Sequence, residues 1–545
     1  MELIDQRTKA IMEGCKERAR KAGLNFQEET LEYIVTNRDL IELTPKLMIP
    51  TLYDYWVHDV EVLREKGRYE LYPSNPYETV INTRPAISFY NDNNPDWMNV
   101  MIFYHVLAHI DFFQNNVYFK NTWDYDFTGQ ALSDKRTIAK LRSEKGRWVD
   151  YVIEFARGID NLVGYYSEMT NNDVLPHHSE SSALDFYFDI FLQVIRKVPV
   201  TGYMKELEKY NSYTKEFKET AEQVFFTEVR AKYPEFNSLL DRYRKHRGDN
   251  RCDIYQYILR NSESLHKEKN AWIRSIMEVV RKTSIFFQPQ IRTKTMNEGW
   301  ASYWHERLFL ADDRIKGHEV DFAKTHSGVA SMPRVGLNPY ALGMRMFQYI
   351  EEMADKGKYS AGYMRISDSM EREKYDRKTG NGMDYIFDVR RDLCDSIFID
   401  YFIDQDFVTR HDLFVAGRRL NQERMVWEYY VKSRKAEDYK DMMRDNLYHP
   451  PYITVDQSGE NESTLYLNHH FEGKPLVNEY ISNTLLGLEF LWGGPVQLET
   501  SEVVSAGGDE RRPAPSSVKG DKQELKWKRV LYTMSGRKLS KKELE

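Results

Sequence analysis

The sequence predicts a mainly α-helical protein, with a large multi-helix body over residues 1–445 and a small α+β module over residues 446–545. Apolar residues recur at helical spacing through most of the body, whereas apolar and polar residues alternate in short runs after residue 446. Hydrophobic residues make up 41% and charged residues 30% of the 545, a composition typical of a globular protein long enough to bury a large core.

The helical spacing in the body locates the expected helices. It covers the stretch from Leu31 to Gly67, with breaks at Pro45 and Pro50. A short apolar stretch and a polar turn precede a helix expected over roughly 95–118, with Asn94 as its cap and Pro95 as its first residue. The later helical ranges are 135–170, 180–198, 204–245, 252–282, 294–311, 338–355 and 384–404.

The C-terminal module is expected to contain four short strands and one helix. A hairpin is predicted from PPYITVDQSGENESTLYLNHHF, and a helix that ends in glycines from KPLVNEYISNTLLGLEFLWGG. PVQLET and KRVLYTM predict two further strands. The segment between them, at about 501–522, is rich in Gly, Pro, Ser and charge, which predicts a flexible loop.

Charge and composition exclude several classes of protein. The chain carries 77 Lys and Arg against 84 Asp and Glu, a net charge of −7, so no basic field predicts a nucleic-acid partner. No run approaches the roughly 18 apolar residues of a membrane span. Three scattered cysteines and a charged N-terminus without a signal peptide predict a reducing, cytoplasmic location.

Two histidines four residues apart, His105 and His109 in HVLAHIDFF, form the first candidate metal ligands. On a helix they lie about 40° apart on one face, so both imidazoles can reach one ion such as zinc. The zinc motif H-E-x-x-H has its general base at the position that Val106 occupies here. Because paired histidines in an aromatic helix are also common core residues, a metal site requires a third ligand.

The stretch TMNEGWASYWHERL supplies the third candidate, Glu298, which shares a helical face with Ser302 and His305. Two His and one Glu would leave an open coordination position for water. Gly299 allows a second helix or a ligand to approach closely. The alternative is that Glu298 is an acidic residue near a helix N-terminus, beside the packed Trp300, and binds no metal.

A hydrolytic site without a base at Val106 needs another proton acceptor, and His305 is the first candidate. His305 could instead be a fourth ligand or a second-layer partner of a ligand. His326, in an expected loop, could enter the same pocket. Asp111 follows His109 by two residues, so it points away from the histidine face and suits a cross-helix structural role.

Several long motifs occur together in the order VINTRPAISFY, HVLAHIDFFQNN, MNEGWASYWH, LNPYALGMRMF, DSIFIDYF and GKPLVNEYISNTLLGLEFLWGGPVQLET. This series resembles the SpoVR family, named for stage V sporulation protein R, over nearly the whole chain. The resemblance implies a role in sporulation and formation of the spore cortex. Ala108 stands where many members have glycine before the second histidine, a change that leaves both histidines intact.

Two functions are consistent with these patterns. The first is a cytoplasmic, metal-dependent hydrolase, with zinc as the expected ion, that cleaves a peptide-like or cell-wall-precursor bond. The second is a non-catalytic sporulation or stress protein, with a structural metal or none, that acts through a protein partner. The absence of the usual base at Val106 favours the second function, and an open coordination position would favour the first.

Overall fold

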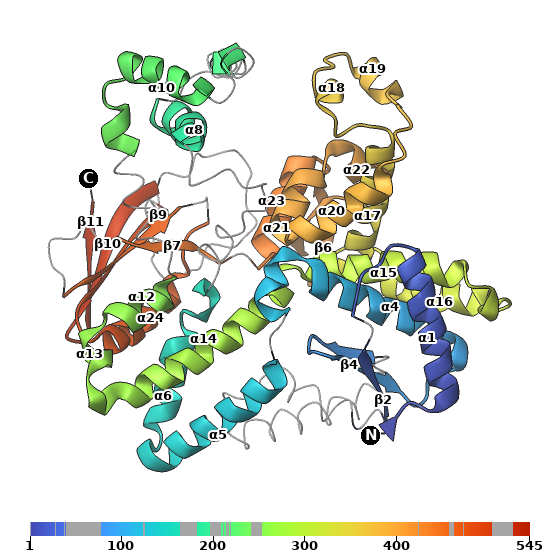
Figure 1. The fold of residues 1–545 in the computed structure, drawn as a ribbon, viewed down its shortest axis with the longest axis horizontal. Helices are drawn as coiled ribbons and strands as arrows, with labels where there is room; N and C mark the ends of the chain where they lie inside the picture. Colours follow the sequence, from blue (N-terminus) through green and yellow to red (C-terminus); the bar gives the residue numbers. More distant parts are fainter. Residues whose placement is uncertain are drawn as a thin grey trace.

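The structure is a computed structural model that describes residues 2–27, 29–36, 78–123, 126–163, 183–196, 220–240, 253–422, 424–448, 450–456, 463–471, 474–503 and 527–544, with isolated positions between 39 and 217. The predicted fold class is confirmed, since the described chain is mainly helical and ends in a small module that contains a β-sheet (Figure 1). None of the helices in these ranges combines the length and apolar character that a membrane crossing requires.

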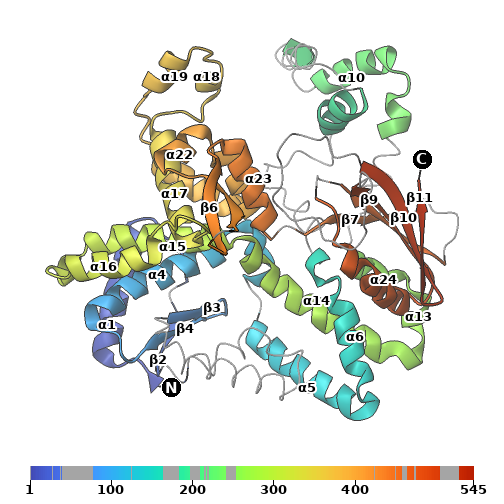
Figure 2. The same ribbon diagram turned by 180° about the vertical axis from the view of Figure 1, so that it is seen from behind.

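Three helices form the centre of the body, with α15 (Lys294–Leu310) packed against both α4 (Asp96–Asn115) and α17 (Pro339–Asp355). Figures 1 and 2 both show α4 and α15 side by side, and α1 (Gln6–Lys21) packs against α4. One large hydrophobic core joins these helices to α20 (Gly382–Asp392), α21 (Asp395–Phe402) and α22 (Gln405–Arg410). α4 begins at Asp96, with Pro95 rather than Asn94 at the capping position.

A four-stranded sheet near the N-terminus was not predicted. Its order is β1 (Glu2–Leu3), β2 (Thr30–Val35), β4 (Ala86–Asn91) and β3 (Glu78–Ile81), and β2 and β4 are parallel. The helix prediction that began at Leu31 is therefore wrong over β2, where β-branched residues and pairing with β4 outweigh the helical spacing. Most of that stretch, from residue 40 to 67, lies outside the described residues.

The remaining helices follow the predicted ranges with breaks. The range 135–170 covers the later part of α5 (Phe127–Lys145), which begins before it, and all of α6 (Trp148–Arg157); the two helices are separated at Gly146, whose φ is 61°. The range 252–282 contains α12 (Ile254–Asn261), α13 (Glu263–His266) and the start of α14 (Ala271–Arg292). Elsewhere the described helices are α8 (Ala183–Asp185) with a π-helix (Phe186–Ile195), α10 (Ala221–Lys232), α16 (Glu319–Ala330), α18 (Ala361–Met364), α19 (Ser369–Lys374) and α23 (Ala436–Asn446).

A separate hairpin, β5 (Val415–Asn421) with β6 (Val426–Ser433), was also not predicted. Its strands lack the regular alternation of apolar and polar residues that identifies a strand packed on a core. Aromatic side chains such as Trp427 and Tyr429 are exposed on it instead.

The C-terminal module is a five-stranded sheet of order β11-β10-β9-β8-β7 with one helix, α24 (Asn478–Trp492). The predicted hairpin is β7 (Tyr452–Val455) with β8 (Leu465–His470), and α24 connects β8 to the parallel strand β9 (Val496–Val503). β10 (Trp527–Ser535) was predicted, whereas the exposed, Lys-rich β11 (Lys538–Glu543) was not. β9 runs to Val503, so the predicted loop cannot begin at 501, and its remainder lies outside the described residues.

The module packs directly on the body. A second hydrophobic core contains residues of α24 and of β8, β9 and β10 together with residues of α6, α12 and α14. In Figure 1 these helices lie against the red and orange elements of the module. The sheet therefore completes a core that begins more than 300 residues earlier, at Ile138.

Candidate metal centre

Helix α4 holds the two histidines within the protein interior. Every residue from Val100 to Phe113 is buried, because α4 contacts β3 and β4 as well as α1 and α15. His105 is 7% exposed and His109 is 5% exposed. Val106 is fully buried in the main core, so this position contributes packing and no proton chemistry.

The first turns of α15 are fixed by a carboxylate and by two glycines. Asp395 accepts hydrogen bonds from the backbone N–H groups of Thr295 and Met296, at 2.7 and 2.8 Å, which satisfies unpaired donors at the helix N-terminus. A Cβ atom at Gly299 would lie 2.4 Å from the backbone of Gly343 in α17. The close approach expected at Gly299 is therefore confirmed, and it positions the adjacent Glu298.

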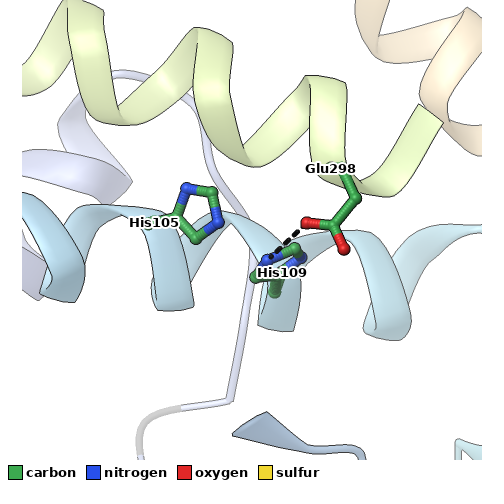
Figure 3. Close-up of side chains that lie close together, drawn as sticks. All are labelled: His105, His109 and Glu298. Atoms are coloured by element: carbon green, nitrogen blue, oxygen red, sulfur yellow. Dashed lines mark ion pairs between the residues drawn. The ribbon is translucent and has the colours of Figure 1, made fainter. Parts of the chain in front are cut away.

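The structure brings His105, His109 and Glu298 together (Figure 3). One ligand atom from each of the three side chains lies within 4.8 Å of the others. His109 Nε2 is 3.6 Å from Glu298 Oε2, close to the separation of about 3.4 Å between two tetrahedral ligands each about 2.1 Å from one ion. Among the described residues, no other His, Cys, Asp or Glu joins this group.

Asn297 orients His109. Its side-chain oxygen lies 2.9 Å from His109 Nδ1, so that nitrogen carries the proton and donates it to Asn297. The lone pair of Nε2 is consequently directed to the Glu298 side. A histidine that binds a metal through one nitrogen commonly donates a hydrogen bond from the other in this way.

Three further side chains extend from His105 towards the surface. His105 Nδ1 lies 2.8 Å from His305 Nδ1, and His305 Nε2 lies 2.8 Å from His326 Nδ1. His326 Nε2 is 3.7 Å from Glu306 Oε1, and the Glu306 side chain is 31% exposed. Both ring nitrogens of His305 are therefore engaged by other imidazoles. His326 reaches this position from helix α16, so the prediction that it lies in a loop is wrong.

Burial determines the charge of the site. Desolvation, reinforced by neighbouring imidazoles, holds the pKa values of His105 and His305 well below their usual range. Both rings are thus neutral near pH 7, the form that binds a metal or accepts a proton. Burial also raises the pKa of Glu298 to about 7, although a hydrogen bond with Tyr340 opposes this shift.

One oxygen of the Glu298 carboxylate has no hydrogen-bond donor among the described residues. This oxygen, Oε2, is buried. A buried carboxylate oxygen without a partner is costly, and a divalent cation would supply that partner. The donor set therefore fits a divalent ion of the zinc type, for which two imidazoles and a carboxylate are common ligands.

Asp111 has the structural role expected for it. It accepts a hydrogen bond from Trp300 Nε1 at 2.8 Å and one from the backbone N–H of Asn25 at 2.7 Å. Arg390 lies 3.4 Å from the same carboxylate. Asp111 thus links α4 to α15, α20 and the segment after α1, on the side of α4 away from the histidines.

The fold and the donor set define a mainly helical protein with a candidate two-histidine, one-glutamate centre. The family model described as SpoVR like protein matches residues 4–450, well over half of the chain, and the chain therefore belongs to the SpoVR family. A relative in Escherichia coli (strain K12), "Uncharacterized protein YcgB", is 22% identical over 496 residues, which cover 86% of each chain. No solved structure matches the chain.

Sequence reasoning missed two polar residues at this centre, Asn297 and Tyr340. Asn297 immediately precedes Glu298, and its proximity could have been inferred from the shared helix turn. Tyr340, at the start of α17, stacks near His105 with ring centroids 6.3 Å apart. Nothing in the local sequence around Tyr340 predicts that contact.

Proposed function

We propose that His105, His109 and Glu298 bind a divalent metal ion, with zinc the best fit, and that this SpoVR-family protein is a metal-dependent hydrolase of a peptide-like bond. The observation that carries the proposal is the buried, unpaired Glu298 Oε2 atom 3.6 Å from the Nε2 atom of His109. A third donor, His105, belongs to the same group.

A three-ligand set supports catalysis rather than a purely structural role. Structural zinc sites usually have four protein ligands, whereas catalytic sites keep a position open. When bound, the ion would polarise a substrate carbonyl and acidify a water molecule. The half-exposed Tyr340, hydrogen-bonded to Glu298, gives the site a further polar group on the side of α17.

The hydrogen-bond chain has one proton arrangement that is consistent with this ligand set. If Nε2 of His105 is the ligand, Nδ1 carries the proton and donates to His305 Nδ1. His305 then donates from Nε2 to His326 Nδ1, and the Nε2 proton of His326 faces Glu306. In this arrangement each of the three imidazoles is oriented by its contact with the next residue, and the last contact is with the Glu306 carboxylate.

His305 remains our candidate for the proton acceptor. It is neutral and buried, and it lies directly behind a proposed ligand. In the arrangement above, the lone pair of His305 is on Nδ1 and accepts from His105, so His305 could take up a proton only when that hydrogen bond opens; release of its Nε2 proton to His326 would then pass a proton towards Glu306. This arrangement would replace the glutamate that the usual zinc motif carries at the position of Val106.

The substrate class rests on the family. SpoVR membership gives a link to sporulation, and we propose that the bond cleaved belongs to a cell-wall or cortex precursor. The competing function is that of a non-catalytic protein with a structural metal that acts through a partner. The missing glutamate at position 106 favours that alternative.

Zinc affinity tests the metal site. We expect wild-type protein to bind one equivalent of zinc and His109→Ala to bind at least about 100-fold more weakly, because a direct ligand is lost. His318→Ala removes a half-exposed histidine outside the site and is the matched control. Unchanged zinc affinity in His109→Ala would contradict the proposal. Mass spectrometry of cell-wall precursor peptides incubated with metal-loaded and metal-free protein then tests hydrolysis.

A further inference from the structure

A cavity of about 640 Å³ lies between the helical body and the C-terminal module, apart from the metal centre. Its wall includes residues before and after residue 450, where the family match ends. Its volume is in the range of sites that bind a small molecule, about 300–1,000 Å³.

The floor of the cavity is aliphatic. It combines side chains from α24, from β8 and β9, and from the helical body, all of them buried: Ile159, Ile254, Leu467, Leu485, Leu488 and Leu498. His469 is the buried polar residue among those that line the cavity, and its Nδ1 atom is engaged by Thr500 at 2.7 Å, so a strongly polar ligand would find few hydrogen-bond partners there. The floor can accept a hydrocarbon chain.

The rim is also apolar, although it faces solvent. Ile397 is 43%, Val477 57% and Tyr480 67% exposed, and all three line the cavity. Exposed large apolar residues that continue into a buried apolar floor mark a binding site more often than isolated ones do.

The two cations at the rim differ in their pairing with described residues. Arg444 is paired with Asp400, which also lines the cavity, and with Asp441, each 2.8 Å away. Lys474, which also lines the cavity, forms no ion pair with any residue that the structure describes. A single unpaired positive charge beside an apolar cavity favours a ligand with one negative group at the end of an apolar body.

We infer that this cavity binds an amphiphile, an apolar chain with a terminal carboxylate, with the chain against the aliphatic floor and the carboxylate beside Lys474. The inference does not depend on the proposed function. Because both the body and the module contribute walls, bound ligand would also hold the two parts together.

Dodecanoate, kept below its micelle concentration, is the probe, and binding to the full chain is measured by calorimetry and native mass spectrometry. We expect saturable binding of one molecule. Thr484→Trp, which fills the cavity from α24, should weaken binding at least tenfold. Asn483→Trp makes the same change at the adjacent exposed residue and should bind within twofold of wild type.

Lys474→Gln tests the contribution of the ligand's carboxylate separately from that of its apolar chain. It should weaken dodecanoate binding about three- to fivefold, as expected for an exposed ion pair, and leave binding of dodecanol unchanged. Lys538→Gln, on the exposed strand β11, is the control. The inference is overturned if dodecanoate does not bind saturably, if Thr484→Trp binds as wild type does while retaining its circular dichroism, or if Lys474→Gln leaves dodecanoate affinity unchanged.

Discussion

At the scale of single residues, Asn297 is the most informative contact around the proposed centre. Its side-chain oxygen fixes the proton of His109 on Nδ1. Asn297→Leu removes that acceptor and should weaken zinc binding by about 10–100-fold, the usual effect of losing such a partner. Asn297→Asp keeps an acceptor and should retain most of the affinity. Calorimetric titration with zinc measures both variants. An affinity of Asn297→Leu equal to that of wild type would exclude an orienting role for Asn297.

His305 can be tested against its alternative as a ligand. His305→Ala should abolish hydrolysis of a substrate that wild type cleaves. The zinc affinity of this variant should fall by about 10–100-fold and no further, because only the partner of His105 is lost. His109→Ala should lose activity and bind zinc at least about 100-fold more weakly, because a direct ligand is lost. If His305→Ala loses zinc to the same extent as His109→Ala, His305 is a fourth ligand, and the structural-metal function becomes the better one.

A buried carboxylate outside the proposed ligand set, Asp312, gives a pH prediction. Burial opposes ionisation of Asp312, but hydrogen bonds from Arg314 and Tyr104 outweigh it and lower its pKa to about 2. Because this folded-state pKa lies below the ordinary 3.8, the stabilisation is complete above about pH 4 and is lost as pH falls through about 2. Its size is about 2 kcal/mol.

Asp312→Asn checks this contribution. The variant should be less stable than wild type at neutral pH, and its free energy of unfolding should change less between pH 4 and pH 2. Urea denaturation at several pH values measures both quantities. Parallel curves for the two proteins over that interval would show that Asp312 contributes no pH dependence.

At the scale of elements, the contact between α15 and α17 depends on two glycines. A Cβ atom at Gly343 would lie 2.2 Å from the backbone oxygen of Thr295, and a backbone atom cannot move aside as a flexible side chain can. Gly343→Ala should therefore cost about 1–3 kcal/mol or more. Gly328→Ala, in the open helix α16, meets nothing within 4 Å and should stabilise by up to about 1 kcal/mol. Thermal unfolding measures both, and equal stability of the two variants would contradict the close packing.

Helices were predicted more successfully than strands. Apolar periodicity identified α4, α15 and α17, because each buries a long surface against the same core. The strand β2 shows no alternation that separates it from a helix, and its state depends on pairing with β4, more than 50 residues away. The strands β5 and β11 bury almost nothing, so they lack the pattern from which strands are recognised.

Spacing in the sequence predicted the members of the candidate site but not all of their contacts. The separation of His105 and His109 is a property of one helix, and Glu298 was found by the need for a third donor. The contacts of His305 with His105 and His326 join three different helices, so spacing could propose His305 but could not give its partners. The contact of Tyr340 with Glu298 likewise requires the crossing of α15 and α17.

At the scale of the whole molecule, the two largest of the four hydrophobic cores in the described chain adjoin the two proposed sites. The first surrounds α4 and α15 and holds the proposed metal centre. The second joins α6, α12 and α14 to the C-terminal sheet and lies beside the cavity that we assign to an amphiphile. We therefore expect substitutions at the proposed metal centre and substitutions at the cavity to act independently of each other.

The central claim is that one ion is held by His105, His109 and Glu298, and zinc X-ray absorption spectroscopy of the zinc-loaded intact chain tests it most directly. The account predicts a four- or five-coordinate ion, with two imidazole ligands at about 2.0–2.1 Å and oxygen ligands at about 2.0–2.2 Å. One imidazole signal should disappear in His109→Ala. A shell of oxygen atoms without imidazole scattering, or a spectrum unchanged by His109→Ala, would contradict it.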